Sequence, residues 1–490
     1  MFNNDIHKQQ KIEFVNIEEL MPQDHFLRDL DRLVSFYFIY GKVEHLYSKI
    51  GRRSIDPVVI IKMLLIGYLY GINSERKLEQ EIKVNIAYKW FLGINLSESV
   101  PDHSTLSQLR RRKFKGTNLF EEIFDEIVHK CIDVGLVTGS ILCTNSTHVR
   151  ANARNDLRET IEVEDKPSKY IQRLDEEAIH NGLIKPKKVR SFKMKKVIKS
   201  ITDPDSGILS RPGKPTGFHY LSHQTCDGNN GIITDVFVTS ANISDKTPHT
   251  ERILYQMAKF HFDTKEICAD GAYYSSEIHS EMYKRNIKTY IPIRNPEKYD
   301  DIKFTVNDFK YIEQEDCFIC PNGEKLLVGG YKLGRGNIKY VCSKRICGNC
   351  TLHKDCTKQE QKVLLKSINY RYSEKQNLNV GTARYYELMR LRKIWCEGNF
   401  SHQKANHNLR KTFKRGNEKV TEHCLLSTCA LNLKRLVKYL KGRYSTPKSL
   451  IYIQIYLINT KIRQAKKLNS LSDYFFTYLS TAPFRYAPTQ

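Results

Sequence analysis

The strongest constraint on the fold is the alternation of short apolar runs with helix-like segments across residues 139–293. Apolar runs with the length of strands lie at 140–144, 217–225, 231–240, 265–270 and 287–293. Segments 246–260 and 275–285 have the pattern of helices. The turn sequence at 227–231 predicts a tight hairpin between the second and third strands. Three antiparallel strands followed by alternating helices and strands predict a mixed α/β sheet.

The rest of the chain divides by composition. Residues 1–135 have the pattern of an all-α N-terminal domain, and a strongly charged insertion, 154–212, interrupts the α/β region 136–299. Within it, residues 185–199 hold eight cations and no acid, which predicts either a polyanion-binding arm or a solvated surface helix. The remaining regions are a small cysteine-rich insertion at 300–375, core helices at 376–440 and a basic aromatic tail at 441–490. In the tail, 451–458 fits a strand or a helix equally well.

No segment is typical of a membrane protein or a secreted one. The longest apolar stretch, 58–72, contains Lys62 and is too short to span a bilayer comfortably. It is better explained as a buried helix with Asp56 as its N-cap and Pro57 at its first position. The polar N-terminus has no signal-peptide pattern, and thirteen cysteines without a secretory signal argue against a disulfide framework. We therefore expect a cytoplasmic protein without a membrane partner.

The charge of the chain predicts a polyanionic partner. Its 490 residues include 79 Lys and Arg against 54 acids, a formal net charge of +25, while a 40% hydrophobic content is ample for a packed core. Such an excess favours DNA or RNA, with an anionic membrane as the second choice. Arg110, Arg111, Arg112 and Lys113 end a helix predicted to begin after the capping candidate Asp102. They suit a phosphate backbone, although cations at a helix end also complement the helix dipole.

The cysteine-rich insertion has the spacing of a structural zinc site. Two C-x2-C pairs, Cys317 with Cys320 and Cys347 with Cys350, are the favoured ligands of a tetrahedral Zn²⁺. The substitutes are Cys342, Cys356 and His353. The alternative is a set of reduced thiols without metal. A zinc ion would order a segment that has few apolar residues.

Three positions are candidates for chemistry. Asp270 ends an apolar run and is followed by Gly271, which suits a ligand of a hard divalent cation. Glu397 lies on a probable helix among cations that could grip phosphates: Arg390, Arg392, Lys393, Lys404 and Arg410. Each acid also has an ordinary explanation, as a strand-end residue or as a surface ion pair. At the end of the first apolar run, Asn145 has an amide where an active site usually carries a carboxylate.

The chain resembles the bacterial insertion-sequence transposases of the DDE type, which have an RNase H-like catalytic core. The likeness runs from about residue 20 to 440 and is closest to the subgroup with a helical N-terminal domain and a cysteine-rich insertion before the last acid. It rests on ordered matches at 21–33, 51–82, 90–96, 100–114, 145–153, 202–207, 217–225, 232–245, 267–275, 396–404 and 431–436.

The resemblance assigns roles to the three positions. The family's first catalytic Asp matches Asn145, its second Asp matches Asp270, and its Glu matches Glu397. The basic residue four positions before that Glu is Lys393 here. Three carboxylates in this arrangement hold two Mg²⁺ or Mn²⁺ ions for in-line attack on a phosphodiester. An amide at residue 145 removes one negative charge, so cleavage should be strongly reduced.

The resemblance implies a transposase that binds the terminal inverted repeats of its element as double-stranded DNA. It would cut at the ends and join them to target DNA, as a homodimer in a synaptic complex. Arg110–Lys113, Lys404 and Arg410 are the expected DNA contacts. The alternatives are a catalytically inactive DNA-end-binding protein or repressor, which Asn145 favours, an RNase H-like nuclease, and a zinc-ordered RNA-binding protein.

Overall fold

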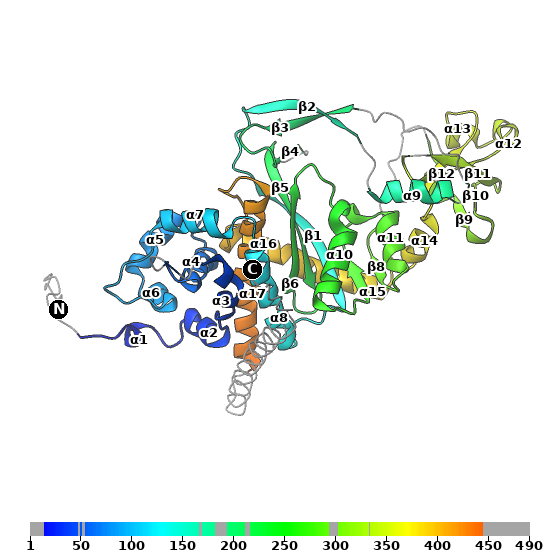
Figure 1. The fold of residues 1–490 in the computed structure, drawn as a ribbon. Helices are drawn as coiled ribbons and strands as arrows, with labels where there is room; N and C mark the ends of the chain where they lie inside the picture. Colours follow the sequence, from blue (N-terminus) through cyan, green and yellow to red (C-terminus); the bar gives the residue numbers. More distant parts are fainter. Residues whose placement is uncertain are drawn as a thin grey trace, which may run out of the picture. The chain divides into compact units, whose positions relative to one another are not determined.

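The computed structural model describes residues 14–47, 50, 54–165, 169–180, 182, 194–210, 216–293, 302–332 and 334–443. The chain forms two compact units, each described here by itself (Figure 1). The first comprises Met1–Met63, Glu75–Lys113 and Leu433–Gln490, and the second Leu64–Ser74 and Phe114–Asn432. This division differs from the expected domain boundary at residue 135, because the segment from Phe114 onward belongs to the second unit.

The first unit is helical, as predicted. Its elements are α1 (Ile17–Leu20), α2 (Phe26–Leu33), α3 (Phe38–Val43), η1 (Glu44–Leu46), the start of α4 (Pro57–Leu69), α5 (Glu75–Val84), α6 (Ile86–Leu92), α7 (His103–Leu109), most of the π-helical turn η2 (Arg110–Phe114) and the end of α17 (Asn417–Arg443). Both predicted N-caps are confirmed. Asp56 accepts from the Val58 amide at 2.7 Å, and Asp102 accepts from the Ser104 amide at 2.7 Å.

The second unit contains the predicted mixed sheet. Its strands are β1 (Ile141–Arg150), β4 (Gly207–Leu209), β5 (Gly217–Asp227), β6 (Ile233–Ser240), β7 (Glu266–Cys268) and β8 (Lys288–Tyr290), in the order β4-β5-β1-β7-β8 with β6 also paired to β5. β5 is antiparallel to both β1 and β6, whereas β7 is parallel to β1 and to β8. An antiparallel β6-β5-β1 meander extended by two parallel strands has the expected RNase H-like strand order.

Helices cover this sheet. The predicted helices α10 (Lys246–Phe260) and α11 (Ser276–Tyr283) connect β6 to β7 and β7 to β8. α8 (Leu119–Asp133) and α10 contact β6, while α15 (Ala383–Arg392) contacts β7 and β8, and η6 (Lys393–Glu397) contacts β1 and β5. α14 (Tyr370–Asn377) and α16 (Gly398–Asn406) complete the set. The candidate acid Glu397 is therefore carried by a π-helical turn that packs directly on the central strands.

The charged insertion does not form the expected arm or surface helix over residues 194–199. These residues lie in β3 (Met194–Ser200), which pairs antiparallel with β2 (Arg158–Glu164). Helix α9 (Lys169–His180) lies between the two strands in the sequence. Glu159 lies opposite Lys199, and Glu162 lies opposite Lys196. Cross-strand pairs of opposite charge stabilise a sheet, so these lysines are matched by acids within the insertion. Residues 185–193 lie outside the described residues, as does segment 451–458.

The cysteine-rich segment forms a second sheet, in the order β13-β12-β11-β10-β9. Its elements are η4 (Val306–Asp308), β9 (Lys310–Ile312), η5 (Glu313–Glu315), β10 (Cys317–Ile319), β11 (Lys325–Lys332), β12 (Asn337–Val341), α12 (Lys344–Gly348), α13 (His353–Cys356) and β13 (Val363–Ser367). Contrary to the expectation of few apolar residues, the segment has a buried cluster that includes Phe318, Leu326, Tyr340 and Leu364. Apolar packing therefore contributes to its order.

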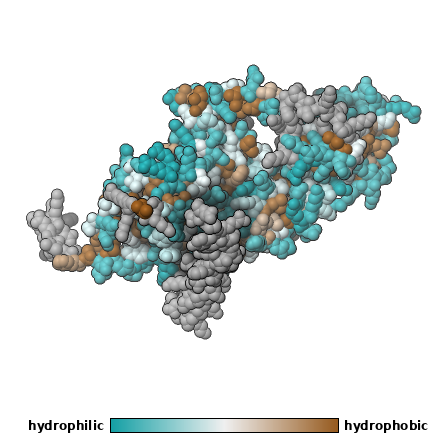
Figure 2. Space-filling view, in the orientation of Figure 1, coloured by the Kyte–Doolittle hydropathy of each residue, from teal (hydrophilic) through white to brown (hydrophobic). Residues whose placement is uncertain are grey.

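Among the described residues, no helix is long and apolar enough to cross a membrane. The face of the protein drawn in Figure 2 is largely hydrophilic, with scattered apolar side chains. Scattered exposed apolar side chains are ordinary on proteins and need no membrane to explain them.

Candidate active site

Asn145 lies on β1, and Asp270 lies just beyond the end of the neighbouring parallel strand β7. The last pair of the β1–β7 ladder is Cys143 with Cys268. Asn145 follows Cys143 by two residues, still paired to β5, and Asp270 follows Cys268 by two residues. Side chains two residues apart on a strand share a face. The two candidate positions are therefore brought together by the register of the sheet.

Local hydrogen bonds fix both side chains. The Asn145 Oδ1 atom accepts from the Ser146 amide at 2.8 Å. Asp270 is the N-cap of the short helix η3 (Gly271–Tyr273), where its Oδ1 atom accepts from the Ala272 amide at 2.8 Å. Among the described residues, no lysine or arginine lies within ion-pair distance of Asp270. Its carboxylate consequently keeps an uncompensated negative charge.

Glu397 arrives on the face of the sheet that carries Asn145. The preceding residue, Cys396, is buried with its Sγ atom 3.5 Å from that of Cys226 on β5. Cys226 pairs with Cys143 across the β1–β5 ladder, so η6 covers the Cys143 and Asn145 face. The four core thiols below the candidate site are Cys143, Cys226, Cys268 and Cys396. They are buried, as expected for cysteines in ordinary core positions.

A cation already occupies part of this face. Arg392, whose side chain is 12% exposed, donates to Glu397 Oε1 at 3.1 Å. The pKa of the Cys143 thiol is raised, first by its hydrogen bond with Cys268 and then by burial, while the positive charge of Arg392 acts in the opposite direction. The Arg392 guanidinium therefore lies near β1 as well as Glu397. Lys393, the residue matched to the family's basic position, is exposed and has no such contact with Glu397.

Four other acids of the second unit have partners away from residue 145. Asp235 pairs with Arg252, and Asp156 pairs with Arg154. Asp203 accepts from the Tyr220 hydroxyl at 2.7 Å, and Asp205 accepts from the Asn417 amide at 2.9 Å. None of these contacts involves β1 residues 143–147.

The sequence did not single out Asp245, which the structure places beside β1. Its Oδ1 atom accepts a hydrogen bond from the Ser146 hydroxyl. The ring of His223 lies on its other side, with Nδ1 4.0 Å from the same oxygen. Asp245 ends the matched segment 232–245, but an aspartate just before a helix is too common to be noticed without the fold.

The expected DNA-binding cations have different surroundings. Arg110 is paired with Glu75, and its side chain is 9% exposed. Lys113 lies over the Tyr47 ring, 3.4 Å from its centroid. Arg111 and Arg112 are exposed on η2. Two of the four cations therefore have partners inside the first unit, and two face solvent.

The other two expected DNA contacts lie in the second unit, and Arg410 is near the end of β1. Lys404 is partly buried on α16, and Arg410 is exposed after it. The Arg410 carbonyl accepts from the Arg150 amide at 3.2 Å, and a β-bridge joins Arg150 to Lys411. These contacts gather several cations near the carboxyl end of β1.

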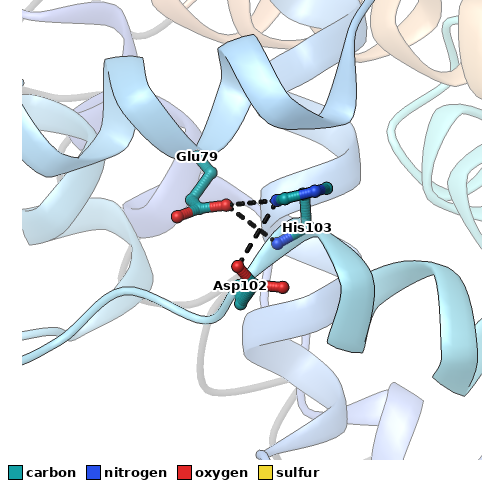
Figure 3. Close-up of side chains that lie close together, drawn as sticks. All are labelled: Glu79, Asp102 and His103. Carbon is teal, nitrogen blue, oxygen red and sulfur yellow. Dashed lines mark hydrogen bonds and ion pairs between the residues drawn. The ribbon is translucent and has the colours of Figure 1, made fainter.

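A cluster of Glu79, Asp102 and His103 in the first unit has the composition of a metal site (Figure 3). Glu79 accepts from the His103 amide at 3.0 Å and lies 2.7 Å from His103 Nδ1. Lys83 donates to Glu79 at 2.5 Å, and this bond is the largest cause that lowers the Glu79 pKa to about 2. Each group already has a protein partner, so the cluster ties α5 to the start of α7.

Cys342 contacts Cys347, and the pKa of the Cys356 thiol is raised, chiefly by burial, with Cys320, Cys347 and Cys350 in its neighbourhood. Among the described residues, however, no three of these sulfurs all lie within 4.8 Å of one another. Backbone amides donate to the sulfurs of two of them, from Glu324 to Cys320 at 3.3 Å and from Lys362 to Cys347 at 3.5 Å. Cys317 instead lies beside Glu315, 3.9 Å from its carboxylate.

Comparisons with known proteins agree with this architecture. Residues 15–112 match the family described as "Transposase domain (DUF772)", and residues 319–437 match the family described as "Transposase DDE domain". No curated protein matches the chain. One similar solved structure is the cryo-EM structure of the piggyBac transposase synaptic complex with hairpin DNA, at 11% identity and a TM-score of 0.36 over 95% of this chain and 86% of that one.

A TM-score of 0.36 does not by itself support a fold assignment, so the assignment rests on the strand order of the central sheet. The two family matches cover separate regions, the helical N-terminal unit and the region from the cysteine-rich sheet through Glu397 to α17. Divalent metal ions are the cofactors that a DDE domain implies. Together, the two matches show that these two regions of the chain are similar to transposases, and the second of them to the DDE domain.

Proposed function

We propose that this chain is the transposase of a bacterial insertion sequence. It binds the terminal inverted repeats of its element as double-stranded DNA, cuts at their ends, and joins the 3′ ends to target DNA. The observation that carries the proposal is the shared register of Asn145 and Asp270 beyond the Cys143–Cys268 pair, with Glu397 on the same face. Joining two ends requires two active sites, which favours a homodimer in a synaptic complex.

Asp270 and Glu397 are the carboxylates that would hold Mg²⁺ or Mn²⁺ here. When bound, the metal supplies activation of a water or 3′-hydroxyl and stabilisation of the leaving oxygen. Asp270 is held by the Ala272 amide through Oδ1, and no hydrogen bond engages its Oδ2 atom among the described residues. Glu397 must exchange its contact with Arg392 for a metal, and Arg392 is then placed to attract a phosphate.

By themselves, the three matched residues Asn145, Asp270 and Glu397 are a poor site for a divalent cation. Asn145 contributes a neutral amide oxygen, and its Oδ1 atom already accepts from Ser146. Glu397 is partly neutralised by Arg392. Hard divalent cations prefer several carboxylate oxygens. We therefore infer that the chain binds its DNA ends but cleaves them weakly, which also describes an end-binding repressor.

Two surfaces would contact DNA, one in each unit. In the first unit, Arg111 and Arg112 are exposed on η2. In the second unit, Arg150, Arg410, Lys411 and Arg415 lie near the end of β1, where the Arg415 Nε atom donates to the Asn152 carbonyl at 3.0 Å. Phe413 is 54% exposed among these cations. Cations around an exposed ring suit a phosphate backbone and an unstacked base.

We also propose a structural Zn²⁺ in the cysteine-rich segment. The proposed ligands are Cys320, Cys347 and Cys350, with Cys356 or Cys342 as the fourth ligand in place of Cys317. Backbone amides donate to the Cys320 and Cys347 sulfurs, the kind of hydrogen bond that orients ligands at metal sites. The sheet has its own apolar core, so zinc would add local order to a segment that is already packed.

A paired-end assay tests the proposed function. Strand transfer would be measured with the element's terminal sequences and Mg²⁺ or Mn²⁺, for this chain and for Asn145→Asp. The expected result is weak activity that the aspartate raises. Equal activity of both proteins would show that other residues hold the metals. Preference for structured RNA over DNA ends in a competition assay would contradict the proposal, and unspecific cutting without joining would favour an RNase H-like nuclease.

A further inference from the structure

Asp245 stands at the start of α10 but does not act as its cap. Its backbone is already helical, with φ −52° and ψ −37°, and its side chain makes no capping hydrogen bond. The carboxylate turns instead to β1, where it accepts from the Ser146 hydroxyl. With 15% of its side chain exposed, Asp245 remains within reach of a small cation. Its position is therefore set by the sheet rather than by the helix.

The charge of Asp245 is uncompensated, like that of Asp270. Among the described residues, neither carboxylate has a lysine or arginine within ion-pair distance. Other partly buried acids of the same unit do have such partners: Asp235 pairs with Arg252, and Asp125 pairs with Lys259 at 2.5 Å. Partly buried carboxylates are normally paired or coordinate a metal. In a chain with a formal charge of +25, two unpaired acids at one edge of the sheet need an explanation.

A buried and unpartnered nitrogen faces Asp245. The Nδ1 atom of His223 makes no hydrogen bond and lies 4.0 Å from Asp245 Oδ1, while Nε2 contacts the Thr239 hydroxyl at 2.9 Å. His223 is 5% exposed, so its unpartnered Nδ1 atom is shielded from water. A metal ion on Asp245 would satisfy both groups.

Tyr273 links Asp245 to Asp270. This tyrosine belongs to η3, which Asp270 caps, and it is 1% exposed. Burial raises its pKa far above the usual range, and the negative charges of Asp245 and Asp270 raise it further. The ring of Tyr273 packs edge-on against His249 of α10, 5.1 Å between centroids. This contact holds η3, which Asp270 caps, against the helix that begins after Asp245.

The end of the β1–β7 ladder explains how acids from both faces meet. Beyond Cys143 and Cys268 the two strands no longer pair. Asn145 and Ser146 point to opposite faces because side chains alternate along a strand. Glu397 therefore approaches from the η6 face, whereas Asp245 approaches from the α10 face through Ser146. Where the ladder stops, no strand separates these two faces.

We propose that Asp245 supplies the carboxylate that Asn145 lacks, so that a divalent cation is held by Asp245 together with Asp270. This inference rests on the proposed function and refines its metal site. It assigns the remaining metal binding of this chain partly to Asp245, which is not one of the three positions matched to the family's catalytic acids. It also predicts that the site of this chain is displaced toward α10 and His223.

Binding of Mn²⁺ to the full chain without DNA tests the proposal, with free Mn²⁺ followed by electron paramagnetic resonance. Asp245→Asn keeps the size of the side chain and an acceptor for Ser146, but it removes the charge. We expect it to weaken Mn²⁺ binding by about tenfold or more, as Asp270→Asn should. Asp156→Asn, which changes an exposed acid of the same unit, is the control and should bind as the unaltered chain does.

Ser146→Ala separates charge from position, because it removes the hydrogen bond and leaves the Asp245 carboxylate. We expect its Mn²⁺ affinity to stay within about threefold of the unaltered chain, which is the scale of one neutral hydrogen bond. Unchanged binding by Asp245→Asn would overturn the inference while leaving the proposed function standing. Equal losses in Ser146→Ala and Asp245→Asn would also overturn it, since Asp245 would then only position β1.

The proposed function fails in a different way. If neither the unaltered chain nor Asn145→Asp bound Mn²⁺ or joined paired DNA ends, the transposase site itself would be absent. That outcome would remove the basis of the Asp245 inference as well. Unchanged melting temperatures of the variants, measured by circular dichroism, would show that the losses are not due to unfolding.

Discussion

Asn145 on β1 and Asp270 just past the end of β7 each lie two residues beyond the Cys143–Cys268 pair, the last pair of this parallel ladder. The structure therefore has the Asp270 carboxylate and the Asn145 amide at two positions where two metal-binding acids would be expected. The relationship comes from strand register, which fixes every side chain on a strand at once. Residue 145 thus faces the site whatever its identity.

Restoring the acid should restore activity. We expect Asn145→Asp to raise strand transfer of paired DNA ends by about two orders of magnitude, because a carboxylate ligand contributes several kcal/mol of charge stabilisation to a two-metal site. Adding Asp270→Asn to this variant should abolish the gain. A gain that persisted in the double variant would mean that Asp270 is not a ligand.

Arg392 should compete with metal for Glu397. Removing it in Arg392→Gln should tighten Mn²⁺ binding by about two- to fivefold, the range expected for one partly exposed ion pair. Titration of the DNA-free chain checks this. Arg390→Gln is the matched control, because Arg390 is exposed on the same helix. Identical affinities of the two variants would exclude competition by Arg392.

The exposed cations of η2 should set the salt dependence of DNA binding. Replacing Arg111 and Arg112 with alanine should reduce the slope of log K against log salt by about 2, roughly one unit for each phosphate contact. Arg110→Ala should leave the slope unchanged and lower the melting temperature, because Arg110 is paired with Glu75. A smaller slope in Arg110→Ala would place that side chain on the DNA.

Zinc content should distinguish the two ligand sets. Purified protein is expected to contain about one zinc equivalent, and Cys350→Ser should lose it. Cys317→Ser should retain zinc, since the Cys317 thiol is directed to the Glu315 carboxylate. Elemental analysis of the three proteins gives the answer. Loss of zinc from Cys317→Ser would restore the ligand set expected from the spacing.

The Glu79 contacts should stabilise the first unit at neutral pH and fail in acid. The folded pKa of Glu79 is lowered from 4.5 to about 2, so its contribution is present above about pH 4.5 and lost as the pH falls toward 2. Glu79→Gln lacks this titration. The difference in melting temperature between the two proteins should therefore shrink between about pH 5 and about pH 3. A constant difference would mean that the charge of Glu79 is not involved.

Much of the fold follows from local pattern. The strands of the central sheet other than β4, the helices α10 and α11, and the caps Asp56 and Asp102 were predicted, because apolar periodicity and capping act over a few residues. β1 extends to Arg150, well past the predicted strand, since its second half is stabilised by pairing with β5. A partner strand more than sixty residues away leaves no trace in a local window.

The sequence by itself determined the class of the core, the three matched positions and the absence of an acid at residue 145. Tertiary structure decided which charges are available. Lys196 and Lys199 face acids across a hairpin, Arg110 is paired, and Asp245 lies unpaired beside Ser146. The physical reason is that a charge acts through its distance and burial relative to other groups. Residue types are written in the chain, but these distances exist only once it is folded.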